Sequence, residues 1–122
     1  MLVVAVGDAL IFQARIWETA KALGVEVRFA KDAAGAEAHW AQAGVGLVDL
    51  SLASADPLDV VRRLRAQRPE VPIVGYGSHV ETALLNQARE AGCTTVLPRS
   101  AFVQQLPRLL AGNGGVPLTA VD

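Results

Sequence analysis

The feature that most constrains this fold is a fivefold alternation of short apolar runs with longer segments of helical periodicity. Several of the runs are apolar on both faces, which is typical of strands buried in the middle of a parallel sheet. The five predicted strands are Leu2–Val6, Val25–Phe29, Val45–Asp49, Val71–Tyr76 and Thr94–Leu97. Five strand-then-helix units imply right-handed crossovers and a doubly wound α/β sheet with helices on both faces.

Start and stop residues mark the helices. The predicted segments run over Ala9–Leu23, from Asp32 to about Gln42, from Asp56-Pro57 to before Pro69, from Ser78 (with Glu81 as a capping box) to Gly92, and from Ser100 onward. The first helix is expected to turn Leu10, Trp17, Ala20 and Leu23 toward one face. Pro107 falls inside the last helical pattern and predicts a kink or an irregular start, because proline removes a backbone donor.

Composition narrows the class of protein. The chain has 122 residues, 52% of them hydrophobic, and a net charge of −1. That length is enough for one domain that buries a hydrophobic core. The nearly neutral net charge argues against a nucleic-acid or membrane partner. Cys93 is the single cysteine, which excludes an internal disulfide and zinc sites built from several cysteines. No run approaches the roughly 20 apolar residues of a membrane span, so we expect a cytoplasmic protein.

In a doubly wound sheet, ligands bind at the carboxyl ends of the strands. Here these ends carry Asp8, Asp49, the segment 76–78 and Arg99. The stretch from Leu47 to Leu52, with Asp49 at a strand end, and the amphipathic segment 56–65 together resemble the centre of a response-regulator receiver domain. Residues 71–74 and 88–101 resemble its fourth strand, fourth helix and fifth strand.

The ending Leu-Pro-Arg-Ser-Ala at 97–101 is most similar to the branch that carries helix-turn-helix output domains. The resemblance covers residues 2 to about 112. It implies a flavodoxin-like (βα)5 fold with strand order 2-1-3-4-5, and a receiver-like domain over residues 1–112 in two-component signalling. Gly112–Asp122 has no periodicity, so residues 113–122 are interpreted as a tail or linker stub.

The resemblance also implies roles for the strand-end residues. Asp49 stands at the phosphoacceptor position. The family holds Mg²⁺ with that aspartate, an acidic pair after the first strand and the backbone carbonyl two residues past the acceptor, which is Ser51 here. The acidic pair falls on Val6 and Gly7. Asp8 comes one position late and would need a strand bulge to point inward, so Asp8 and Asp49 are weak metal candidates and no cofactor is expected.

Three further positions depart from the family pattern. The hydroxyl residue at the end of the fourth strand is Gly77, with Ser78 one place later. The lysine after the fifth strand is Arg99, which keeps the charge but not the shape of the group. The switch aromatic of the fifth strand is Val96, with Tyr76 a neighbour of the hydroxyl position. Together these departures favour a pseudo-receiver that has given up aspartyl phosphorylation.

Plainer interpretations of the same residues remain open. Asp49 could serve only as a structural partner of Arg99, and Asp8 could cap the helix that follows it. Cys93 is expected to be a buried packing residue. The basic cluster of the third helix is expected to be a solvated face; it comprises Arg62, Arg63, Arg65 and Arg68.

Four functions are weighed. The first is a non-enzymatic signalling module that binds another protein or itself through the family's contact surface, here Glu81–Ala91, Thr94–Leu97 and Phe102–Leu110. The second is a phosphorelay receiver that uses Asp49 and Mg²⁺. The third is a small-ligand binder or an enzyme on the same fold, for which no nucleophile–base pair or cofactor motif is present. The fourth is a regulator fragment separated from its output domain.

Overall fold

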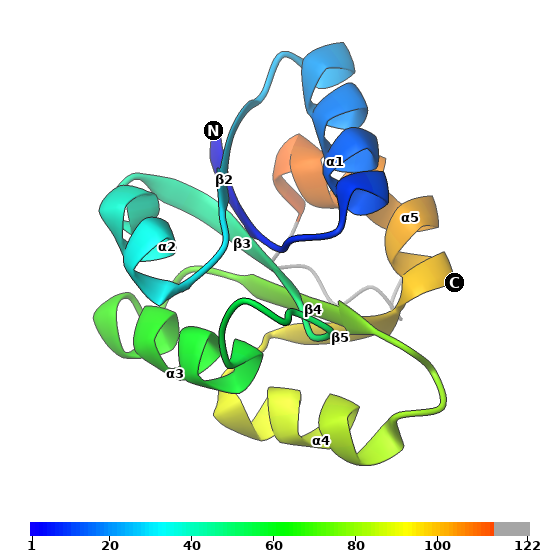
Figure 1. Ribbon diagram of the computed structural model, residues 1–122. Coiled ribbons are helices and arrows are strands. Elements are labelled where there is room, and N and C mark those ends of the chain that lie inside the picture. The colour runs from blue at the N-terminus through cyan, green and yellow to red at the C-terminus, as the bar shows by residue number, and fades with distance from the viewer. Residues whose placement is uncertain (114–122) are drawn as a thin grey trace.

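The computed structural model describes residues 1–113 as a five-stranded parallel sheet with helices on both faces (Figure 1). The strands are β1 (Leu2–Val6), β2 (Glu26–Ala30), β3 (Ala43–Asp49), β4 (Ile73–Gly77) and β5 (Thr95–Pro98). Their order is β2-β1-β3-β4-β5, and every pairing is parallel. The predicted fold class and strand order are confirmed. The predicted tail lies, apart from residue 113, outside the described residues.

Helices connect the strands. They are α1 (Leu10–Leu23), α2 (Ala33–Trp40), α3 (Pro57–Gln67), α4 (Thr82–Ala91) and α5 (Arg99–Arg108), and a π-helical turn, η1, follows at Leu109–Asn113. The regular helix thus ends one residue after Pro107. Within the described part of the chain, no helix combines the length and the apolarity that crossing a membrane requires.

Two apolar layers hold the helices to the sheet. One face of the sheet packs against α2, α3 and α4, and the other packs against α1, α5 and η1. Strand alternation explains the division: Val4 and Val6 of β1 enter the first layer, while Val3 and Ala5 enter the second. Both faces of the central strands are therefore dry, as their continuous apolar character predicts.

Several helix ends follow the sequence signals. Asp32 accepts the N–H of Gly35, and Asp56 accepts the N–H groups of Leu58 and Asp59. Gly24 ends α1 in the left-handed region, at φ 68°.

Two predicted caps are wrong. The capping box does not form, because α4 starts at Thr82 without a side-chain cap. Likewise Ser100 lies inside α5, whose N-cap is Pro98.

The prediction of which face of α1 turns inward is also wrong for three of its four residues. Ile16 and Ala20 are buried, whereas Leu10 and Trp17 are 78% and 54% exposed and Leu23 is also exposed. The inward stripe is centred on Ile16 with Phe12 beside it. Leu10 and Trp17 lie about 100–120° around the helix from Ile16, at 100° per residue. The result is a helix with apolar side chains on more than one face.

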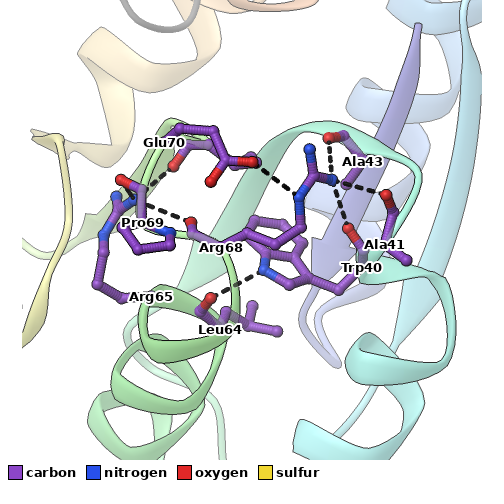
Figure 2. A network of polar contacts seen from close by, with 9 residues as sticks. Trp40, Ala41, Ala43, Leu64, Arg65, Arg68, Pro69 and Glu70 are labelled. Atoms are coloured by element: carbon purple, nitrogen blue, oxygen red, sulfur yellow. Dashed lines mark hydrogen bonds and ion pairs between the residues drawn. The ribbon is translucent and has the colours of Figure 1, made fainter.

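The basic cluster on α3 is not simply a solvated face. Arg65 donates to the carbonyls of Pro69, Val71 and Gly92 at 2.7–2.9 Å. Arg68 donates to the carbonyls of Trp40, Ala41 and Ala43 (Figure 2). These two guanidinium groups satisfy backbone oxygens at the amino edge of the sheet, so half of the cluster is structural.

Candidate functional site

Asp49 ends β3 and lies at the carboxyl edge of the sheet. It is 2% exposed and is the one buried charged residue of the described chain. Its Oδ1 accepts the N–H of Ser51 at 2.8 Å. Burial raises the pKa of this carboxyl; the Ser51 bond and the Arg99 guanidinium oppose that rise, and the Asp8 carboxylate adds to it. Asp49 is therefore under the opposing influences of a positive group, Arg99, and a negative one, Asp8.

Asp8 lies near Asp49 but faces the β3–α3 loop. Its Oδ2 accepts the N–H groups of Ala53 and Ser54 at 3.1 and 3.2 Å, and the Ser54 hydroxyl donates to the Lys31 carbonyl at 2.6 Å. The predicted capping of α1 by Asp8 is wrong, because the N-cap is Ala9 and receives no side-chain bond. The only irregularity in the β1–β3 register lies at the far end of the strand, between Leu2 and Val3. No bulge therefore turns Asp8 inward.

Gly7 is the immediate neighbour of Asp49 across the sheet. The β1–β3 register pairs Val6 with Val48, so the next residues along are Gly7 and Asp49. A Cβ on Gly7 would lie 3.3 Å from the Asp49 Cβ and 3.9 Å from its Oδ2. The position from which a second carboxylate would reach the buried acid thus carries only hydrogen.

Arg99, the first residue of α5, is the positive group nearest in effect to Asp49. Its Nη2 donates to the Ser51 Oγ at 2.6 Å. Among the ion pairs of residues 1–113, none joins Arg99 to Asp49. The contact expected from the sequence is therefore replaced by a bond to the serine two residues beyond the acid, and Arg99 acts on Asp49 through its charge.

A shallow hollow of about 370 Å³ opens beside Arg99. The ends of β4 and β5 and the loops after them line it, with Gly77, Ser78, His79, Pro98, Arg99 and Ser100. The Ser78 Oγ accepts the Val80 N–H at 3.4 Å, so this hydroxyl serves its own loop. A Cβ on Gly77 would meet Leu50 and Leu85 at ordinary contact distances, which leaves no hydroxyl at the end of β4.

Tyr76 belongs to the site, although the sequence indicates only that it is a neighbour of the hydroxyl position at the end of the fourth strand. It is the register partner of Asp49 in β4. Its ring is stacked on Phe102 of α5, with centroids 3.8 Å apart and planes 8° from parallel, and is tilted against Phe12. Its hydroxyl would lie 3.6 Å from a Cβ on Gly7. Burial raises the pKa of Tyr76 far above its usual range, so the phenol stays neutral. The alternation of side chains between the two faces of β4 is the sequence signal that could have identified this role.

Several solved structures superpose on most of this chain. NtrX of Brucella abortus superposes with a TM-score of 0.79 and 21% identity, over 93% of this chain and 27% of that one. A CheY-like receiver domain of Methanospirillum hungatei superposes with a TM-score of 0.78 and 14% identity, over 93% and 92%. The chain has the fold of a response-regulator receiver domain.

A further solved structure and one curated protein are also similar to this chain. A Burkholderia pseudomallei response regulator, solved with a phosphorylated aspartic acid, a calcium ion and citrate, superposes with a TM-score of 0.76 and 21% identity, over 93% of this chain and 68% of that one. The transcriptional activator ExaE of Pseudomonas putida is 30% identical over 74 residues, which are 57% of this chain and 35% of that protein. The chain thus spans about a third of the curated relative. No family model matches.

The residues present do not fit the magnesium site that the receiver fold implies. Mg²⁺ needs near-octahedral oxygen ligands. Here the Asp49 and Asp8 carboxylates each have one oxygen that accepts hydrogen bonds from backbone N–H groups, and Gly7 supplies no carboxylate. Within residues 1–113, no three His, Cys, Asp or Glu side chains are grouped as metal ligands would be.

Proposed function

We propose that this chain is a receiver module that transmits a signal by binding another protein and that does so without aspartyl phosphorylation. The observation that carries the proposal is Gly7, because it leaves the buried Asp49 without the neighbouring carboxylate that a metal-assisted phosphoryl transfer requires. The retained Asp49 then serves as a buried charge balanced by the Ser51 N–H and the Arg99 guanidinium.

The contacts of the other site residues support this proposal. The Arg99 guanidinium donates a hydrogen bond to Ser51, and the Asp8 carboxylate accepts hydrogen bonds from the β3–α3 loop. The Ser78 hydroxyl accepts one from its own loop. An incoming phosphoryl group would have to break these contacts before it gained new ones. We therefore assign this edge of the sheet a structural role, and the protein a binding role rather than an enzymatic one.

The binding surface that we propose consists of α4, β5 and α5. The outer positions of α4 are exposed, among them Asn86 and Gln87, and so is Gln104 on α5. The partner we expect is another signalling protein. The similarity of one segment to a transcriptional activator supports a setting in which the domain controls a linked or separate output domain.

A phosphorylation assay tests the proposal. The protein is incubated with Mg²⁺ and acetyl phosphate, and its intact mass is measured beside that of Asp49→Ala. We expect no added mass of one phosphoryl group in either protein. A phosphoryl adduct that forms on the wild-type chain and is absent from Asp49→Ala would establish the alternative, a phosphorelay receiver with Asp49 as its acceptor. A receiver domain known to accept phosphate from the same donor is the positive control.

A further inference from the structure

Strand β2 is an edge of the sheet and lies beside the most apolar part of the surface. It pairs with β1 on one side and with no strand of the described chain on the other. Seven large apolar side chains are exposed among residues 1–113, and five of them belong to β2 or to α1, which packs against it. These five are Leu10, Ile11, Trp17, Leu23 and Phe29. Figure 1 shows β2 between α1 and α2.

The free edge of β2 is defined by its hydrogen bonds. The Ala30 carbonyl accepts the Gly7 N–H, so the backbone groups of Ala30, and by alternation those of Arg28 and Glu26, face β1. The N–H and C=O of Val27 and Phe29 consequently face outward. The Val27 carbonyl receives only a long 3.4 Å bond from the Arg28 side chain. The edge therefore presents a short row of backbone groups available to another strand.

The sequence of β2 is self-complementary in charge when the strand is paired with an antiparallel copy of itself. With the two-fold axis at Val27, position 26 of each copy faces position 28 of the other. Glu26 would then oppose Arg28 of the second copy, twice. Within one chain the same two side chains already form an ion pair at 2.9 Å, and both are about half or more exposed. Opposite charges at directly facing positions stabilise an antiparallel pair.

The apolar side of the strand also matches. In this arrangement Val27 faces Val27 of the second copy, and Phe29 faces Val25 of the second copy. Phe29 is 40% exposed, so pairing would cover apolar surface that is in contact with water. The hydrogen bonds are consistent with this register: the Val25 N–H is held by Ala20, but the outward N–H of Phe29 could donate to the Val25 carbonyl of the second copy.

We propose that two copies of this chain associate through their β2 edges, antiparallel about a two-fold axis at Val27, to form one continuous sheet. The pairing is isologous, because the same patch serves both copies. It leaves the α4–β5–α5 surface free for the partner proposed above, since β5 is the other edge of the sheet. The opposite interpretation is that Glu26 and Arg28 keep the edge solvated and prevent pairing, as edge charges do in many proteins.

Charge reversal separates the two interpretations. Sedimentation equilibrium of the full chain is measured for wild type, Glu26→Arg and Arg28→Glu. Each single change sets like charges against each other in both facing pairs, so we expect the dimerisation constant to fall about tenfold or more. An equimolar mixture of the two variants sets opposite charges against each other again and should recover dimers. The ion pair within each chain is broken in both variants, so recovery cannot come from that pair.

Two controls locate the interface. Arg62→Glu, an exposed charge reversal on α3, and Gln87→Arg, on α4, should leave dimerisation unchanged. The unfolding temperature of each variant, measured at low concentration, verifies that the monomer is folded. The proposal is overturned if the wild-type chain stays monomeric at millimolar concentration or if the mixture shows no more dimer than its components. It is also overturned if Gln87→Arg abolishes association while Glu26→Arg does not.

Discussion

Arg68→Met should destabilise the fold far more than its position as the C-cap residue of the basic, polar helix α3 implies. Arg68 Nη1 donates to the carbonyls of Trp40, Ala41 and Ala43, at 2.8, 2.9 and 2.9 Å (Figure 2). These oxygens lie where α2 ends and β3 begins. Trp40 and Ala43 are buried, so water reaches their carbonyls poorly once the guanidinium is removed. Methionine keeps much of the apolar stem and removes only the donors.

The magnitude follows from the number of donors. One Nη carries two hydrogens, so the three carbonyls share about two bonds to a charged group, each contributing roughly 1.5–3 kcal/mol. The Arg68 side chain is 29% exposed, and water can replace part of the interaction at Ala41. We therefore expect a loss of about 2–4 kcal/mol in the free energy of unfolding. For a domain of this size that corresponds to a fall of roughly 10 °C or more in the melting temperature.

Urea unfolding followed by circular dichroism measures this loss. Arg63→Met, five residues earlier within α3, is the matched control, because Arg63 binds the side chains of Glu37 and Asp59 at the surface. Exposed pairs of this kind contribute up to about 1 kcal/mol. If Arg68→Met loses no more stability than Arg63→Met, the carbonyl-anchoring role assigned to Arg68 is refuted.

The acid site responds to pH and to the residue at position 7. The raised pKa of Asp49 means that the native chain binds this carboxyl proton more tightly than the unfolded chain does. The stability that this proton contributes is therefore present at low pH and is lost as the pH rises from below 3.8 through the folded-state pKa. Asp49→Asn should therefore be more stable than wild type at pH 7 and lose that advantage below about pH 4, as urea midpoints across this range would show; an advantage that grows toward acid would contradict the sign. Gly7→Asp restores a carboxylate beside Asp49, and millimolar Mg²⁺ should raise its melting temperature while leaving wild type unchanged; an equal response in the two proteins would contradict the role given to Gly7.

The sheet could be predicted from the sequence because its signal is local and redundant. The runs that are apolar on both faces specify the central strands of a buried parallel sheet, and the strand-end position of Asp49 specifies the edge at which the site lies. The site's contacts could not be predicted, because they depend on side-chain directions across loops. Asp8 binds Ala53 and Ser54 rather than its own helix, a contact between segments 45 residues apart.

The error on α1 has a related cause. The spacing of three or seven residues between Leu10, Trp17, Ala20 and Leu23 predicts one apolar stripe, but a helix with apolar residues on several sides has no single stripe. The buried face is the one that meets the sheet and α5, and only the packing selects Ile16 over Trp17. The same limit applies to Arg65 and Arg68, whose carbonyl partners are set by tertiary structure.

Tyr76 and Phe102 give this receiver fold a packed connection between its acid and its proposed binding face. In the family, as the resemblance implies, a hydroxyl at the end of the fourth strand is coupled to an aromatic residue on the fifth; Gly77 and Val96 supply neither. Here the register partner of Asp49 stacks instead on the first turn of α5, and both rings are buried. Asp49, Tyr76 and Phe102 therefore form one continuous packed path from the end of β3 to α5, in a core whose density leaves little room for any of the rings to move alone.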